Sequence, residues 1–372
     1  MTTSEVLRSR TARWLVPVAV VGVITAGVGV SSAVANADPA LPSRTAADLL
    51  VSLADAPSQP FSGTVAENAD LGIPALPGAA STSLSWQSLI TGSHTARVWY
   101  ASPSQVRVSL VGDMAESDVV RNGTDVWVWQ SRDNSVSHTT LPAGAGTKPD
   151  TTPPIDPATA AARALAAIDP STAVTVDGTS RVAGRPVYEL VLTPRASESL
   201  IGQVRLAIDS ETSVPLRVQV FARGATTPAF ETAFTSISFD TPAASVFAFT
   251  PPPGVQVSES SFPGLGTNPP TAADTVTATK GARPTVVGSG WTAVAVIPDA
   301  GALTSGQSSA QGSGASTTAA LLKATTTVTG SFGTGQLLQT SLVSVLLLSD
   351  GRMLVGAVTP DLLEQVAAST TK

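Results

Sequence analysis

The chain has 372 residues, of which 42% are apolar and only 13% are charged, and its formal net charge is −6. This length allows two domains with linkers. The charged fraction is about half of the roughly 25% that is usual in globular proteins. There is no cysteine, which excludes disulfides, thiolate metal sites and a cysteine nucleophile. Because an acidic chain binds polyanions poorly, we expect no nucleic-acid partner.

Residues 1–37 have the layout of a secretory signal peptide. Arg8, Arg10 and Arg13 form a basic start, an uncharged apolar run begins at Trp14, and small residues end the run at Ala37. The run is also long enough to span a bilayer, which takes roughly 20 residues. An uncleaved N-terminal membrane anchor is therefore the alternative. Both interpretations place the rest of the chain outside the cytoplasm.

The first part of a main domain, residues 38–255, combines one helix with a run of strands. Residues 45–56 have leucines on one helical face, which predicts a short amphipathic helix. From residue 61 to residue 141 the apolar period changes to two, as in half-buried antiparallel strands. Asn122-Gly123, between two apolar runs, predicts a two-residue hairpin turn.

A second run of strands follows an alanine-rich segment, residues 157–168, which predicts a helix that starts at a proline. In the last predicted strand, 229–239, Phe230 and Phe234 have one parity and Ile237 and Phe239 have the other. A bulge near Thr235 would bring all four side chains to the same face of the sheet. The other strands of this run are predicted at 173–176, 185–193, 202–209 and 215–221.

The main domain is followed by a linker and a small second domain. Residues 256–283 are rich in proline, glycine and threonine, which is typical of a linker. Residues 284–372 predict a small α+β domain that ends in a helix at 361–368, with Thr359 as its cap. Its strands are predicted at 291–297, 325–331, 337–348 and 352–358.

Residues that could carry chemistry are few. The chain has two histidines, His94 and His138, and neither has the spacing of a metal site or belongs to a nucleophile motif. Ser93 precedes His94, so a hydrolase that uses His94 is a third and weaker hypothesis. Asp177 is interpreted as a turn cap, and the glycine-rich segment 330–335 as a hairpin turn. We therefore expect no enzyme activity, no metal and no cofactor.

Several short motifs follow one another in a characteristic order. After the signal segment and the first helix come Phe61-Ser-Gly-Thr-Val, the turn and tryptophans of 121–129, the segment 182–190 and the segment 208–217. This order resembles the LolA/LppX/RseB superfamily of extracytoplasmic lipid-binding proteins over roughly residues 45–255. Ser349-Asp-Gly-Arg and Leu354-Val-Gly-Ala-Val-Thr-Pro360 are similar to the second domain of RseB/MucB-type proteins.

The resemblance implies an α+β fold: a curved antiparallel unclosed β-barrel covered by helices, followed by a small α+β C-terminal domain. It implies a non-enzymatic carrier that binds lipid or lipoprotein acyl chains in a hydrophobic cavity. The alternative is an RseB-like sensor that binds a membrane protein such as an anti-sigma factor. Periodicity alone favours an ordinary sheet core for the large apolar side chains, and the resemblance favours a cavity. If they line a cavity, the predicted residues are Trp86, Trp99, Val106, Val108, Leu110, Leu165, Leu206, Ile208, Leu216, Val218, Phe230 and Phe234.

Overall fold

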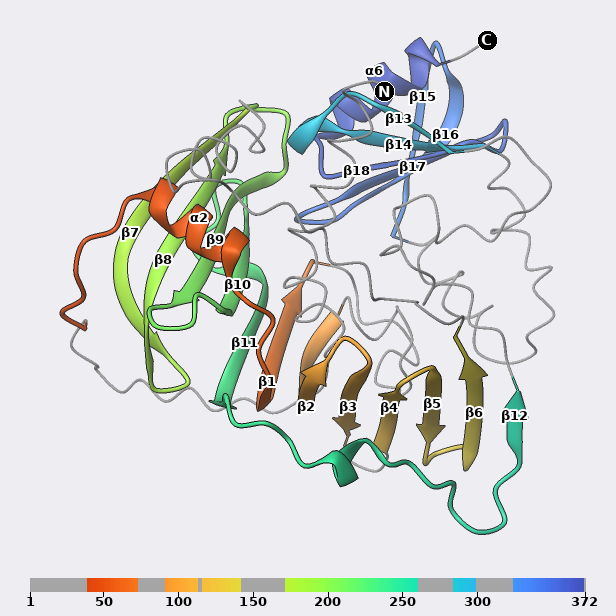
Figure 1. Ribbon diagram of the computed structural model, residues 1–372. Helices are drawn as coiled ribbons and strands as arrows, with labels where there is room; N and C mark the ends of the chain where they lie inside the picture. The colour runs from red at the N-terminus through yellow and green to blue at the C-terminus, as the bar shows by residue number, and fades with distance from the viewer. Residues whose placement is uncertain are drawn as a thin grey trace, which may run out of the picture.

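The computed structural model of the protein describes residues 39–72, 91–112, 116–141, 171–259, 284–298 and 324–370. These residues form a 12-stranded sheet and a six-stranded sheet, as Figure 1 shows. The predicted signal segment and the alanine-rich helix at 157–168 lie outside the described residues, as do Trp86 and Leu165. In the described part of the chain, no helix is long and apolar enough to cross a membrane.

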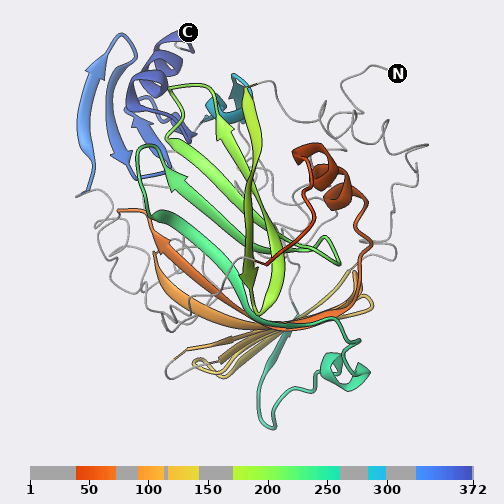
Figure 2. The same cartoon turned by 90° about the vertical axis from the view of Figure 1, so that its left-hand side faces the viewer.

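The larger sheet has the strand order β12-β6-β5-β4-β3-β2-β1-β11-β10-β9-β8-β7. Neighbouring strands are antiparallel except β12 and β6, and the two end strands, β12 and β7, do not pair with each other within the described ranges. The sheet is therefore unclosed, and Figure 2 shows that it is curved, as the resemblance implies. Its strands are β1 (Phe61–Asp70), β2 (Thr91–Ser102), β3 (Gln105–Val111), β4 (Glu116–Asn122), β5 (Asp125–Gln130), β6 (Ser135–Thr140), β7 (Thr172–Val182), β8 (Arg185–Pro194), β9 (Ile201–Asp209), β10 (Pro215–Ala222), β11 (Pro228–Ser238) and β12 (Val257–Glu259).

Helix α2 (Ala46–Asp55) lies against β7–β10 and confirms the predicted amphipathic helix. Its start is fixed by a capping box, in which Thr45 and Asp48 each accept a hydrogen bond from the other's backbone N–H. The hydrogen bonds from Thr45 lower the pKa of Asp48. Leu49 and Leu50 are fully buried against the sheet, and each contributes roughly 1.5–3 kcal/mol of hydrophobic stabilisation.

The predicted bulge in β11 is confirmed by the register of its pairing with β1. Val65 pairs with Phe234, whereas the preceding residue, Thr64, pairs with Ser236, so Thr235 is the extra residue. Ile237 therefore pairs with Gly63, which has the same parity on β1 as Val65. The bulge thus returns the apolar side chains of the strand end to the face that Phe234 occupies.

Two predicted turns need correction. Asn122 pairs with Asp125, so the β4–β5 turn consists of Gly123 and Thr124 and lies one residue later than predicted. Gly123 has a φ of 67°, which glycine adopts without strain at the first position of a tight hairpin turn. Asp177 caps no turn: β7 continues through a bulge after Val176, and Asp177 forms an ion pair with Arg205 at 2.9 Å.

The six-stranded sheet has the order β13-β14-β18-β17-β16-β15, and α6 (Pro360–Ser369) packs on β17 and β18. The predicted single strand at 337–348 is wrong: Thr340 accepts backbone hydrogen bonds from Leu342 and Val343, and this turn separates β16 from β17. The predicted cap is also wrong, because the side chain of Thr359 does not cap α6. The strand predicted at 291–297 begins later, because a 3₁₀ turn at Gly290–Thr292 precedes β14. The strands are β13 (Thr285–Val287), β14 (Val294–Ile297), β15 (Thr326–Gly330), β16 (Gly333–Gln339), β17 (Ser344–Leu348) and β18 (Met353–Gly356).

After β11 the chain crosses to the far edge of the large sheet. A 3₁₀ turn, η1 (Ala244–Phe247), buries Phe247 against β3 and β4. The chain then forms β12, so the predicted linker from residue 256 begins with an edge strand (Figure 1). His138 on β6 holds this strand through Glu259 at 3.1 Å and also bonds Asp125. Burial lowers the pKa of His138, but its hydrogen bonds to the two carboxylates raise it more.

The buried ion pair of Arg217 and Glu189 gives a stability prediction. Glu189 is 5% exposed and accepts hydrogen bonds from Arg217 and Ser180. Arg217→Met leaves this carboxylate without its cation, so we expect a loss of about 3 kcal/mol in the free energy of unfolding. The double variant Arg217→Met, Glu189→Met should lose less. Urea unfolding measures both variants, and equal losses would contradict the prediction.

Candidate binding face

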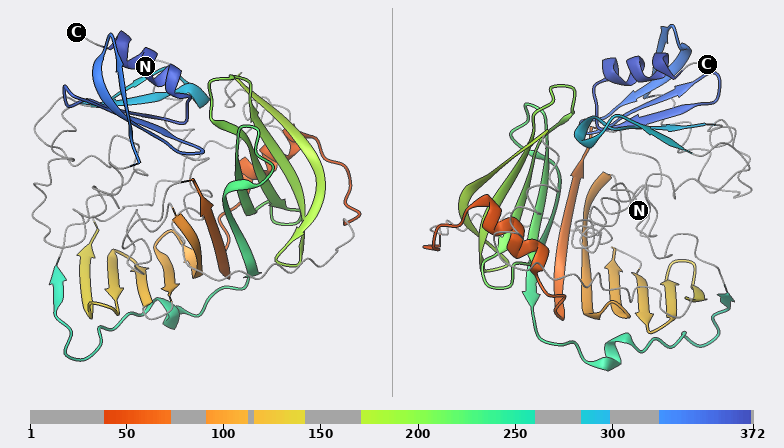
Figure 3. Two further views of the ribbon diagram at one scale, coloured as in Figure 1. Left: turned by 180° about the vertical axis from the view of Figure 1, so that it is seen from behind. Right: turned by 45° about the horizontal axis from the view of Figure 1, so that its top comes forward.

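One face of the large sheet can be followed from strand to strand through its register. Leu190, Leu206, Val218, Thr232, Glu67 and His94 are successive cross-strand partners on β8, β9, β10, β11, β1 and β2. Cross-strand partners point to the same face of a sheet. The first three pack against α2, so we call this surface the α2 face. Figure 3 shows α2 in front of these strands in its right-hand view and behind them in its left-hand view.

The rows on either side of this one are apolar. On one side, Val204, Val220, Phe230 and Ala69 are successive partners, and the first three are half-buried. On the other side, Phe234, Val65, Ala96 and Leu110 are successive partners and are buried. The α2 face is thus an apolar surface that runs across at least six strands.

Most of the predicted cavity residues share the α2 face. Trp99 lies on the opposite face. It pairs with Ser62 on β1 and Arg107 on β3, and side chains alternate between faces along a strand. The neighbours of Arg107, Val106 and Val108, point to the α2 face, so Arg107 and Trp99 point away from it. On the opposite face Trp99 lines a polar pocket with Arg97 and the serines of β1 and β11. Leu216 lies at a bulge in β10 and packs in the cluster of Phe61 and Phe234. The residues on the α2 face are Val106, Val108, Leu110, Leu206, Ile208, Val218, Phe230 and Phe234.

Glu67 lies in the middle of the α2 face. Its side chain is 5% exposed, and Oε2 has no hydrogen-bond partner among the described residues. Thr232, opposite it on β11, is 2% exposed, and its Oγ1 is likewise without a partner. Burial raises the pKa of Glu67 to about 8, because a carboxylate loses its hydration in an apolar environment. Near neutral pH this side chain is therefore mostly the neutral acid.

The other buried carboxylates in the described ranges each have an arginine partner. Asp118 pairs with Arg107, Glu189 with Arg217, and Asp209 with Arg185. Burial alone would raise the pKa of Asp209, but hydrogen bonds from Arg185 and Thr212 lower it below its usual value. Glu67 differs in having no such partner. Sequence reasoning missed it, because a single glutamate in an alternating strand gives the signal of a solvated residue.

The arrangement around His94 does not support the hydrolase hypothesis. Ser93 and His94 are adjacent on β2 and point to opposite faces, and Ser93 donates a hydrogen bond to Asn68 at 2.9 Å. On the α2 face, Glu67 lies between the hydroxyl of Thr232 and the imidazole. Thr232 and His94 are therefore two strands apart, about 9.6 Å, which is too far for a nucleophile and its base. Burial lowers the pKa of His94.

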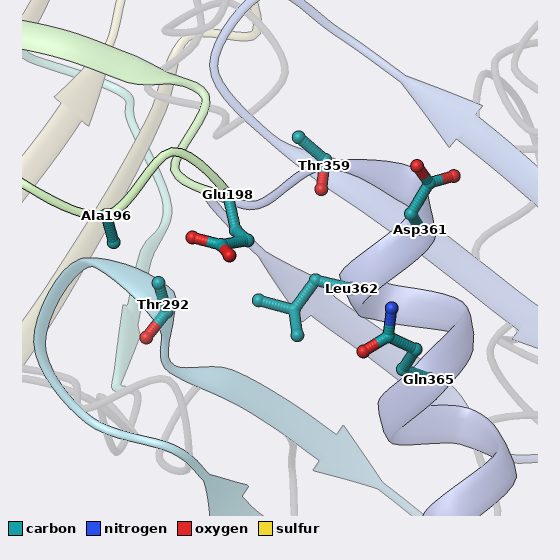
Figure 4. Close-up of a pocket in the computed structure, with 7 residues that line it drawn as sticks. All are labelled: Ala196, Glu198, Thr292, Thr359, Asp361, Leu362 and Gln365. Carbon is teal, nitrogen blue, oxygen red and sulfur yellow. The ribbon is translucent and has the colours of Figure 1, made fainter.

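A second candidate site is the junction between the two sheets. The segment before β9 runs beside the segment that leads to α6: Leu200 donates to the carbonyl of Ala357, and Thr359 donates to that of Glu198. A cavity of about 490 Å³ opens beside this contact (Figure 4). Its lining carries two exposed carboxylates, from Glu198 and Asp361, and it also includes Ala196, Thr292, Thr359, Leu362 and Gln365.

Comparison with known proteins finds matches among solved structures. No protein-family model matches the sequence, and no curated protein matches it significantly. A Pseudomonas aeruginosa MucA/MucB complex is 18% identical, with a TM-score of 0.43, over 87% of this chain and 96% of that one. Another complex of MucB with MucA(peri) has 18% identity and a TM-score of 0.44, over 87% and 97%. A LolA-superfamily protein from Nitrosomonas europaea is 12% identical, with a TM-score of 0.21, over 56% and 99%.

These neighbours include MucB and a LolA-superfamily protein. The likeness is one of fold. Arguments about function rest on the residues of this chain.

The raised pKa of Glu67 gives a prediction about stability and pH. The unfolded chain releases this proton near pH 4.5, whereas the folded chain keeps it up to about pH 8. The contribution of protonated Glu67 to the free energy of unfolding is therefore fully present below pH 4.5, the pKa of this group in the unfolded chain. It is lost as the pH rises from there to about 8, by up to about 1.4 kcal/mol per pH unit. Glu67→Gln cannot ionise, so its stability relative to the unchanged protein should increase from about pH 5 to about pH 8.

Urea unfolding at several pH values measures this difference. Glu231→Gln is the matched control, because Glu231 lies on the opposite face of β11 and is paired with Gln219. The control should show a smaller change with pH. A difference between Glu67→Gln and the unchanged protein that stays constant over the whole range would contradict the prediction.

Proposed function

We propose that the protein is an extracytoplasmic, non-enzymatic carrier whose α2 face holds the acyl chain of a lipid or lipoprotein. The observation that supports this most is the continuity of the apolar rows across β8–β11, β1 and β2 of an unclosed sheet. Phe230, Val220 and Val204 on this face are only half-buried, so apolar area there is available to a ligand. The predicted signal segment supports the location.

The energetics of such a site fit reversible binding. An acyl chain gains roughly 0.8 kcal/mol for each methylene that it buries. About a dozen methylenes would give roughly 10 kcal/mol, of which association consumes a large share. A carrier needs this balance, because a ligand that is bound too tightly is not delivered.

Binding of a fluorescent acyl probe to two matched variants tests the proposal. Phe230 and Trp99 are both half-buried aromatic residues, but they lie on opposite faces of the sheet. Phe230→Ser should weaken binding about tenfold, since it removes most of one large apolar contact. Trp99→Ser should change it less than twofold. Failure of the unchanged protein to bind any acyl probe would refute the carrier function.

A second candidate function is the binding of a membrane protein, such as an anti-sigma factor, at the junction of the two sheets. The acidic lining of the junction cavity, Glu198 and Asp361, favours a partner segment with basic residues. Pull-down from membranes with the full chain, and with Glu198→Lys, Asp361→Lys, tests this. Capture of the same membrane protein by both chains would contradict a role for these carboxylates.

A further inference from the structure

Two neighbouring residues on the α2 face each have a buried polar atom without a hydrogen-bond partner in the described chain. The atoms are Oε2 of Glu67 and Oγ1 of Thr232. The two residues are direct cross-strand partners, so their Cβ atoms are about 5 Å apart. Because folded proteins satisfy nearly all their buried polar groups, an unsatisfied pair at one place needs an explanation.

The surroundings of this pair are apolar on three sides. Val218 and Leu206 continue its row towards α2, while Phe230 and Phe234 are the neighbours of Thr232 on its own strand face. An acyl chain that lies along the α2 face would therefore pass over the pair.

We propose that Glu67 and Thr232 form a hydrogen-bonding anchor for an uncharged polar group of the bound lipid, an ester carbonyl or a hydroxyl. This inference rests on the proposed acyl-chain binding and adds the class of lipid. A protonated carboxyl and a hydroxyl each have one O–H to donate and oxygens that accept. Together they match a neutral oxygen group.

A charged head group fits this position poorly. No arginine or lysine pairs with Glu67 or Thr232 among the described residues. The remaining neighbour in the row is His94, whose pKa burial lowers, so near neutral pH it supplies no positive charge. A carboxylate or phosphate placed here would lose its hydration without a compensating cation.

The test compares the affinities of two probes that have the same acyl chain, an uncharged monoacylglycerol and the corresponding fatty-acid anion, at about pH 7. The unchanged protein should bind the monoacylglycerol at least tenfold more tightly. Glu67→Leu should reduce that preference to less than threefold, and Thr232→Val should reduce it partly. Glu67→Gln, whose amide both donates and accepts, should retain most of it. Glu231→Leu, on the opposite face, is the control and should keep the full preference.

Infrared spectroscopy adds a readout that a merely structural role would not change. The carbonyl band of a protonated carboxyl, present in the unchanged protein and missing in Glu67→Gln, should shift when the monoacylglycerol binds. If the unchanged protein binds neither probe, the carrier function and this inference both fail. If it binds both probes and Glu67→Leu keeps the same affinities, the inference alone is overturned and acyl binding stands.

Discussion

The structure depends on the burial of one apolar face of a large open sheet. In the described part of the chain, α2 covers that face only over β7–β10, where Leu49 and Leu50 pack on Leu190, Leu206 and Val218. The same face continues by register onto β11, β1, β2 and β3. A sheet that curves without closing cannot cover this surface by pairing its own edges. The account of function follows from this geometric constraint.

The buried carboxylates among the described residues of the large sheet follow one rule with one exception. Asp118, Glu189 and Asp209 are buried with an arginine, as the energetics of buried charge require. Glu67 is buried with no such partner and remains neutral up to about pH 8. An apolar side chain at this position would avoid the cost of burying an unsatisfied carboxyl. A ligand that completes its hydrogen bonds gives the exception a physical reason.

Much of the fold could be predicted from the sequence, because local patterns specify it. The capping box at Thr45, the alternation of Val106, Val108 and Leu110 and the bulge at Thr235 are all local signals. The pairing of β12 with β6 could not be predicted, since it joins residues more than a hundred positions apart. For the same reason the sequence could not show that Glu67 and Thr232 are partners. The face of Trp99 depends on the register of β2 with β1 and β3, in which Trp99 pairs with Ser62 and Arg107, and the sequence pattern did not specify this register.

The lipid content of gently purified protein tests the central claim most directly. Native mass spectrometry of the full chain should show a fraction with one bound uncharged acyl lipid. That fraction should decrease strongly in Phe230→Ser, on the α2 face, and should be unchanged in Trp99→Ser, on the other face. Protein that carries no lipid, or lipid loss that is the same in both variants, would contradict the account.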